Sequence, residues 1–263
     1  MKNKMPIGIF DSGIGGLTIL KEIRKILPRE NIIYYGDFKN NPYGIKSTKE
    51  IQKLSEDIVK FMVQNHCKII IIACSLMTAA SLKYLKKKYS VPIIGVVEGG
   101  IKAALLESKN KKIAYIANPF TVKTKIYEKT YQKYSKESSL YGVPCKKLCA
   151  LIETGWKNHP NRLEILKKCL DKIPKDTDTL ILGGTHYPLI KEDIRKIFSK
   201  KIVDSSRECV FELLNLLIST DLFNKENKKG SVDFCINGDT TLLLNRLPEI
   251  FTEEFKNIFS VDY

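Results

Sequence analysis

The sequence lacks long apolar runs and contains few histidines and tryptophans. Its 263 residues include 3 histidines and 1 tryptophan, and the longest apolar run, residues 69–74, is about six residues long. A membrane-spanning helix needs roughly 20 consecutive apolar residues, so the sequence predicts no transmembrane segment. The beginning of the chain also lacks the pattern of a signal peptide. We therefore expect a cytoplasmic protein.

The cysteines do not form a recognisable framework. The 7 cysteines are scattered and odd in number, which makes a set of disulfides unexpected in this location. Cys145 and Cys149 are the one close pair, but neither His159 nor His186 lies at zinc-finger spacing from them. We therefore predict no metal site and interpret most thiols as small core residues.

Arginine is also scarce for so basic a chain. Lysine and arginine total 44 against 29 acidic residues, a net charge of +15, and the excess is almost wholly lysine. Arginine is the residue that recognises phosphates and base edges with two hydrogen bonds. We interpret the charge as a lysine-rich solvated surface, with a polyanion-binding face as the alternative. A positive field would also attract a dicarboxylate substrate.

What the sequence does contain is a regular alternation of strand-like and helix-like segments, in a chain long enough for two medium domains. This alternation indicates an α/β fold with parallel sheets. The expected strands cover residues 6–10, 31–35, 68–73, 91–97, 113–117, 139–141, 179–182, 202–203 and 232–236. The expected helices cover residues 16–26, 48–65 (with Thr48 as N-cap), 77–89, 101–106, 121–134, 163–170, 189–197, 210–218 and 240–247.

Two short polar segments divide this series. We interpret Glu98-Gly99-Gly100 as a hinge and Asp204-Ser205-Ser206 as the return hinge. The sequence thus predicts a first α/β domain from residues 1–98 plus 207–263, and an inserted α/β domain from residues 99–206. The two parallel sheets would face each other across a cleft.

Chemically active side chains follow two of the expected strands. Cys74 comes after residues 68–73, and Thr185 with His186 comes after residues 179–182. Open α/β sheets bind ligands where their strands end. Cys74 is a candidate nucleophile or base at a helix N-terminus, the alternative being a small buried residue. His186 is a candidate general acid, the alternative being a structural hydrogen bond.

Two loops of the first domain could hold a substrate. The turn Asp11-Ser12-Gly13-Ile14-Gly15-Gly16 contains glycines that permit positive φ or close approach, and a helix N-terminus that could bind an anion follows it. Asp11 could hold an ammonium group or polarise a thiol. Pro42-Tyr43-Gly44 is either a plain turn or part of a carboxylate cradle that uses the Tyr43 hydroxyl.

Taken in order, these segments resemble the glutamate racemases over nearly the whole chain. The resemblance is carried by Asp11-Ser12-Gly13, Gly36-Asp37, Pro42-Tyr43-Gly44, Ala73-Cys74, residues 92–96, Glu153, Gly183-x-Thr185-His186-Tyr187-Pro188, Asp204-Ser205 and Gly238-Asp239. In that family two cysteines flank the α-carbon of glutamate, and neither pyridoxal phosphate nor a metal is used. The resemblance implies cofactor-independent production of D-glutamate for peptidoglycan, usually by a homodimer. Some members also act on DNA gyrase.

The resemblance assigns roles to residues of this chain. The implied catalytic residues are Cys74, His186, Asp11 and Glu153. The implied substrate-binding residues are Asp11, Ser12, Pro42, Tyr43, Gly44, Ser75, Leu76, Thr121, Gly184, Thr185 and His186.

Several positions depart from the pattern of the family. Gly184 replaces the second cysteine, Ser75-Leu76 replaces an Asn-Thr pair, and Asn118 replaces a threonine for which Thr121 could substitute. Losing a positioned acid or base costs about 10²–10⁴-fold in rate.

Three interpretations follow from the missing thiol. In the first, the protein is a racemase whose second proton donor is His186, Thr185 or a held water. In the second, it is a one-thiol enzyme, similar to a decarboxylase, that acts on another small dicarboxylate. In the third, it is a catalytically inactive binding or regulatory protein.

Overall fold

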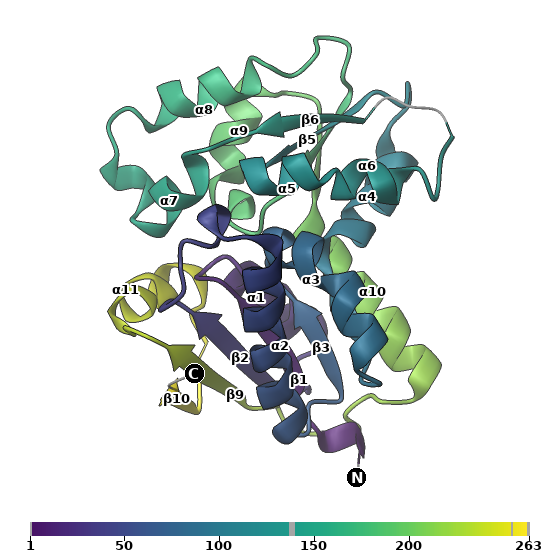
Figure 1. Cartoon of the computed structure of the whole chain (residues 1–263), viewed down its shortest axis with the longest axis vertical. Helices are drawn as coiled ribbons and strands as arrows, with labels where there is room; N and C mark the ends of the chain where they lie inside the picture. The colour runs from purple at the N-terminus through teal and green to yellow at the C-terminus, as the bar shows by residue number, and fades with distance from the viewer. Residues whose placement is uncertain (1, 137–139, 254, 262–263) are drawn as a thin grey trace.

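The computed structural model describes residues 2–136, 140–253 and 255–261 and contains two parallel sheets. Six strands form the first sheet in the order β10-β9-β2-β1-β3-β4, and four form the second in the order β6-β5-β7-β8. Figure 1 shows the two sheets in two halves of the molecule, one above the other. The predicted fold class, two parallel-sheet α/β units, is confirmed.

The strands are short, as buried parallel strands usually are. In the first sheet they are β1 (Ile7–Asp11), β2 (Ile32–Asp37), β3 (Ile69–Ile72), β4 (Ile93–Gly95), β9 (Val232–Asn237) and β10 (Asn257–Val261). In the second sheet they are β5 (Ile113–Ala117), β6 (Leu140–Pro144), β7 (Thr179–Leu182) and β8 (Lys201–Asp204).

The helices that belong to the first half or connect it to the second half are α1 (Leu17–Ile26), α2 (Thr48–Gln64), α3 (Ser75–Lys88), α4 (Val96–Glu107), α10 (Ser205–Thr220) and α11 (Thr241–Ile250). Those of the second half are α5 (Pro119–Thr124), α6 (Ile126–Tyr131), α7 (Leu148–Glu153), α8 (Arg162–Leu170) and α9 (Lys191–Ile197). Short 3₁₀ turns include η2 (Tyr43–Ile45) and η4 (Tyr187–Ile190). Within the described residues, none of the helices combines the length and apolar character needed to span a bilayer.

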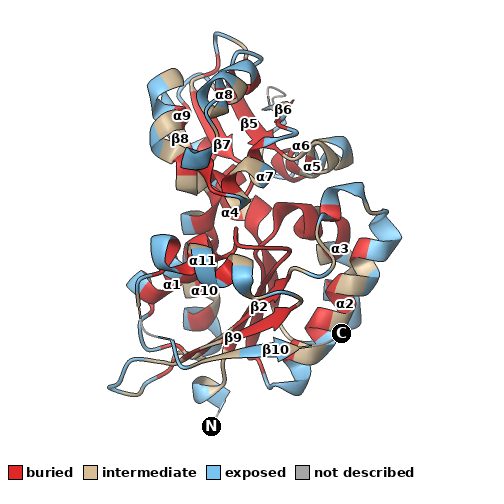
Figure 2. Ribbon diagram, turned by 90° about the vertical axis from the view of Figure 1, so that its left-hand side faces the viewer, coloured by how far each residue is buried: buried red, intermediate tan, exposed pale blue. Residues whose placement is uncertain are grey.

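Each sheet is buried on both faces because helices cover both. In β1, Ile7 and Ile9 belong to a core with residues of α1, α10 and α11, whereas Phe10 packs with α2 and α3. In β7, Leu180 and Leu182 pack with α7, α8 and α9, and Ile181 packs with α4 and α6. Burial on both faces explains why these strands are continuous apolar runs in the sequence. Figure 2 shows buried residues in the inner strands of the sheets, whereas the edge strand β10 is coloured intermediate and exposed.

The chain passes between the halves through α4 and α10. The segment Glu98-Gly99-Gly100, predicted to be a hinge, lies inside α4, and Asp204-Ser205-Ser206 forms the N-cap and first turn of α10. The two helices pack together so closely that a Cβ atom at Gly99 would lie 2.9 Å from the carbonyl carbon of Glu208. These glycines therefore permit helix packing, and the interpretation of the two segments as hinges stays a prediction. The domain boundaries at 98/99 and 206/207 stay predictions.

Several local expectations are corrected. The N-cap of α2 is Ser47, not Thr48, because Ser47 forms a capping box with Glu50. The helix expected over residues 121–134 is two short helices separated by Lys125, which has a φ of 54°. Glu153, which was in none of the expected strands or helices, lies at the end of helix α7. Strand β10 was not expected from the sequence, and Ser139, expected to begin a strand, lies outside the described residues.

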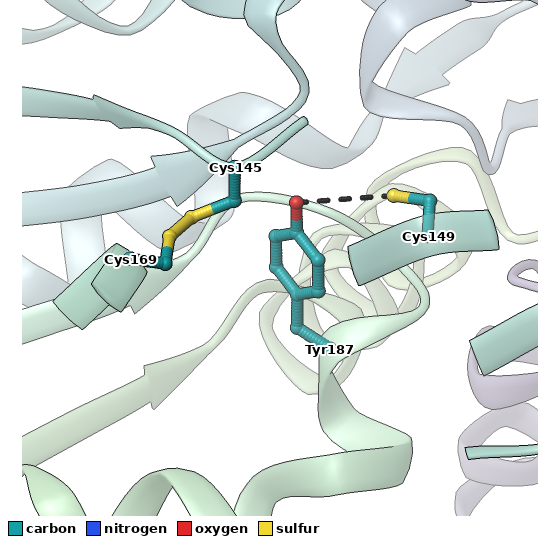
Figure 3. Close-up of a disulfide and its surroundings, with 4 residues drawn as sticks. All are labelled: Cys145, Cys149, Cys169 and Tyr187. Atoms are coloured by element: carbon teal, nitrogen blue, oxygen red, sulfur yellow. Dashed lines mark hydrogen bonds between the residues drawn. A yellow bond between two sulfur atoms is a disulfide. The ribbon is translucent and has the colours of Figure 1, made fainter. Parts of the chain in front are cut away.

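The expectation of no disulfide is also corrected. A disulfide joins Cys145, which follows β6, to Cys169 in α8, with their Cα atoms 5.8 Å apart (Figure 3). The two residues are 24 positions apart, so only the packing of α8 beside β6 brings them together. The other five cysteines are free.

A buried ion pair holds the end of the first sheet opposite the cleft. Lys68 Nζ lies 2.5 Å from Glu30 Oε2, and it also donates to the carbonyls of Asn3 and Leu222. We expect Lys68→Met to lower the free energy of unfolding by about 3–5 kcal/mol, because it leaves the Glu30 carboxylate buried without its cationic partner, with only the Asn224 N–H still bound to it. Urea denaturation followed by far-UV circular dichroism measures this. In the matched control, Lys168→Met removes an exposed pair and should leave stability nearly unchanged; equal losses in both variants would contradict the prediction.

Candidate functional site

A cavity of about 630 Å³ lies at the carboxyl ends of strands from both sheets. It is open to solvent at one side and takes residues from both halves of the molecule. Its lining consists of Ser12, Asn41, Pro42, Tyr43, Gly44, Ile45, Cys74, Ser75, Leu76, Asn118, Pro119, Lys146, Cys149, Ala150, Glu153, Gly184, Thr185 and His186. The structure therefore brings together all the predicted site residues except Asp11, which lies behind the wall, and Thr121.

Cys74 forms one wall of the cavity. It is the last residue before α3 begins, and the backbone N–H groups of Leu76 and Met77 point at its thiol. Ser12 Oγ lies 3.6 Å from its Sγ. Burial, with the charge of Asp11, raises the pKa of the Cys74 thiol to about 12, although the N–H groups and the Ser12 hydroxyl act in the opposite direction. The expected lowering of this pKa by the helix N-terminus is thus outweighed by burial.

Asp11 lies beneath this wall. Its carboxylate accepts hydrogen bonds from the Gly13 N–H at 2.7 Å and from the Thr185 hydroxyl at 3.3 Å. Burial raises its pKa to about 6, against the lowering effects of the His186 charge and the Gly13 hydrogen bond. Asp11 therefore changes protonation close to neutral pH and joins the two halves through Thr185.

The opposite wall is built from the loop after β7 and from α7. His186 Nε2 lies 3.0 Å from Glu153 Oε1, and Asn41 donates to the other carboxylate oxygen of Glu153 at 3.2 Å. Burial acts to lower the pKa of His186, but the hydrogen bond and charge of Glu153 outweigh it and raise that pKa. Burial acts to raise the pKa of Glu153, but bonds to His186 and Asn41 lower it. The pair is therefore held in its ionised form.

The glycine-rich turn after β1 allows these walls to meet. A Cβ atom at Gly13 would lie 2.1 Å from Glu153 Oε1, and one at Gly15 would lie 2.4 Å from Thr185 Oγ1 and 2.6 Å from His186 Nδ1. Neither glycine has a positive φ, so their role is close approach rather than unusual backbone conformation. The side chains that they admit come from the other half of the molecule.

The remaining predicted residues differ in what they present to the cavity. Tyr43 lines it, but its hydroxyl donates to Asp37 and is not directed to a substrate as expected. Thr121 is fully buried in α5 and does not line the cavity. Asn118 lines it in place of Thr121, close to Gly44.

Sequence reasoning missed several lining residues, among them Lys146 and Cys149. Lys146 is exposed at the rim and supplies a positive charge, while Cys149 is partly buried in the first turn of α7. Neither residue was assigned a role from the sequence, where most thiols are interpreted as small core residues. The available signal was the spacing of four between Cys149 and Glu153, which places both on one helix face.

The described residues contain no group of three or more histidine, cysteine, aspartate or glutamate side chains arranged to hold a metal ion. The lining offers thiols, carboxylates and an imidazole, which are groups that perform acid–base chemistry.

Comparison with known proteins identifies the family. The model of the Asp/Glu/Hydantoin racemase family matches residues 8–212. A glutamate racemase of Fusobacterium nucleatum is 46% identical over 235 residues, which cover 89% of each chain. One of Thermoanaerobacter is 38% identical over 260 residues, covering 98% of this chain and 97% of the relative. The chain belongs to the glutamate racemase family.

Solved structures of this family have the same fold. A glutamate racemase isoform from Bacillus anthracis superposes with a TM-score of 0.94 at 30% identity, covering 99% of this chain and 98% of the other. The enzyme from Francisella tularensis, solved in complex with D-glutamate, superposes with a TM-score of 0.91 at 33% identity, again covering 99% and 98%. The likeness to the family therefore extends over both halves and the cleft between them.

The high pKa of Cys74 leads to a prediction about its reactivity in the free protein. Since the pKa is about 12, the thiolate fraction at neutral pH is small and increases with pH. We expect the rate of alkylation of Cys74 by iodoacetamide to rise about tenfold per pH unit from roughly pH 7 to pH 9. Peptide mass mapping of timed samples measures this. A plateau near pH 8 would show that the thiol is already ionised and would contradict the prediction.

The close approach at Gly15 leads to a second prediction. Gly15→Ala places a methyl group against Thr185 and His186, so these side chains must move from Asp11 and Glu153. We expect activity to fall at least about tenfold, because displacing catalytic groups by an ångström is costly. Steady-state kinetics measures the loss. Gly44→Ala is the matched control: its Cβ would lie 3.3 Å from the nearest atom, the Asn118 amide nitrogen, so a smaller loss is expected, and equal losses would contradict the argument.

Proposed function

We propose that this protein interconverts L- and D-glutamate without a cofactor and supplies D-glutamate for peptidoglycan precursors. One observation carries the proposal. Cys74 lines the same cavity as Thr185, His186 and Glu153, in a chain that belongs to this family. The cytoplasmic location and the homodimer expected from the resemblance belong to the same proposal.

The composition of the cavity suits a small anionic amino acid. Lys146 provides a positive charge at the rim, and Ser12, Asn118 and the loop of Gly44 provide polar groups inside. Glu153, in the lining, and Asp11, buried behind it, place negative charge near a substrate ammonium group. The net charge of +15 attracts an anionic substrate to the protein before it reaches the cleft.

We propose that Cys74 acts as the base on one face of the substrate. As a thiolate it would take the α-proton, so that the C–H bond breaks and an S–H bond forms. The N–H groups of Leu76 and Met77 and the Ser12 hydroxyl stabilise the thiolate, and a substrate ammonium group in the cavity would add to this effect. The proton that Cys74 loses when it ionises goes to solvent water, because Asp11, with a pKa of about 6, is a much weaker base than the thiolate.

Protons must also reach the opposite face of the substrate. His186 and Glu153 form an ionised pair at that wall, and we propose that they exchange protons between solvent and the second acid. Gly184 itself has no side chain that could donate, so the second acid is another group of this wall.

One observation favours the alternative substrate class. Leu76 lines the cavity where the family has a hydroxyl group, and an apolar side chain there disfavours a charged substrate carboxylate. A one-thiol enzyme on a less polar dicarboxylate is therefore the second candidate function.

Circular dichroism of the substrate tests the proposed function. We expect the signals of L-glutamate and of D-glutamate to decay to zero with the protein present, because both pure isomers convert to the racemate. Cys74→Ala should lower this rate by at least about 10². Aspartate and 2-methylmalonate serve as alternative substrates in parallel reactions. Persistent optical activity of both glutamate isomers with turnover of another acid would replace the proposal by the second candidate.

A further inference from the structure

The wall opposite Cys74 contains a second free thiol. Cys149 lines the cavity, as do Gly184 and Thr185, and it is not part of the disulfide between Cys145 and Cys169. The structure describes all seven cysteines, and none of the others except Cys74 lines this cavity. The site therefore contains two thiols, although the loop after β7 contributes none.

Tyr187 connects Cys149 to the position of the missing cysteine. A Cβ atom at Gly184 would lie 3.1–3.4 Å from ring carbons of Tyr187. These carbons include Cζ, which carries the hydroxyl. The Cys149 thiol donates a hydrogen bond to this hydroxyl, with Sγ and O 3.8 Å apart. Figure 3 shows the ring of Tyr187 with its hydroxyl pointing toward Cys149, on the side away from the disulfide. The phenol of Tyr187 thus contacts both the Cys149 thiol and the position of the missing cysteine.

Helix α7 places Cys149 beside the proton-carrying pair. Cys149 and Glu153 are four residues apart in one helix, so their side chains share a face. Glu153 in turn binds His186. A proton lost by the Cys149 thiol can therefore be replaced through the Glu153–His186 pair.

On these grounds we propose that Cys149 is the second catalytic thiol of the racemase, which donates a proton to the face of the α-carbon opposite Cys74. This inference rests on the proposed function. In one direction, the Cys74 thiolate takes the α-proton, and the Cys149 thiol gives its proton to the other face of the resulting carbanion. One C–H bond breaks and one forms, and Cys74 ends as the thiol and Cys149 as the thiolate. The reverse reaction exchanges the two roles.

The properties of the two thiols agree with this symmetry. Burial raises the pKa of each to about 12, and the charges of Glu153 and Cys74 contribute to the raised pKa of Cys149. Two thiols whose pKa values are raised in the same way suit a reaction whose substrate and product are mirror images of equal free energy. The hydroxyl of Tyr187 accepts from the Cys149 thiol and can donate to its thiolate, so it stabilises both forms.

Isotope exchange in D₂O distinguishes proton abstraction on the two faces of the substrate α-carbon. The full-length protein is incubated with pure L-glutamate or pure D-glutamate, and proton NMR follows the loss of the α-proton while circular dichroism follows inversion. We expect Cys149→Ala to lower inversion by at least about 10² and to retain α-proton exchange with one isomer only. Cys74→Ala should retain exchange with the other isomer only. Complementary isomer selectivity requires a base on each face, and a structural role for Cys149 would not produce it.

The matched control is Cys235→Ala. It removes another largely buried thiol that does not line the cavity, so inversion and exchange should be unchanged. Inversion by Cys149→Ala within a fewfold of the parent, with Cys74→Ala inactive, would overturn the role of Cys149 and leave the proposed function intact. If the parent exchanges neither isomer, the proposed function fails, and the role of Cys149 fails with it. Far-UV circular dichroism of each variant confirms that its fold is retained.

Discussion

The contact between the glycine turn after β1 and the side chains of the opposite half determines the geometry of the whole site. Glu153, Thr185 and His186 reach this turn only because Gly13 and Gly15 have no Cβ atoms. Through it, Asp11 binds Thr185, and the ionised Glu153–His186 pair sits against the backbone of the first half. The cavity is thus enclosed by two walls that are held in register by direct contacts. A site made of two such walls can place a group on each face of a planar carbanion.

Burial has two opposing effects in this cleft. It excludes water from the reacting groups, which strengthens each electrostatic interaction there. It also raises the pKa of Cys74, so the base is protonated at neutral pH in the free protein. The N–H groups at the start of α3 offset part of this cost, and a bound ammonium group would offset more. The substrate would therefore help to generate the base that acts on it.

Much of the architecture could be predicted from the sequence, because buried parallel strands are continuous apolar runs and the intervening helices have clear periodicity. The sheet order was not predictable in detail, and β10 was missed because Asn257–Val261 is a partly exposed edge strand with a weak apolar pattern. The role of the α4 glycines in helix packing was not predicted, because local sequence does not show that another helix crosses there.

Most of the candidate site was predictable for a similar reason, since residues at the ends of consecutive parallel strands meet at one edge. Cys149 and Lys146 were not predicted, because Cys149 lies on the short helix α7 and Lys146 lies in the turn that joins β6 to that helix. The significance of Cys149 depends on the ring of Tyr187 and on the position of α7 across the cleft. These are properties of tertiary packing, which no spacing rule in a single sequence encodes.

The position of β9 affects the order in which the protein can fold as it is synthesised. β9 pairs with β2 in the interior of the first sheet, yet it follows the whole of the second sheet in the chain. Until residues 232–237 leave the ribosome, the edge of β2 has no partner, and an unpaired edge can pair wrongly with other chains. The inserted sheet β5–β8 is complete some 28 residues earlier, at Asp204. The part of the molecule that is made second can therefore finish folding first, and the amino-terminal half must wait for the carboxyl terminus.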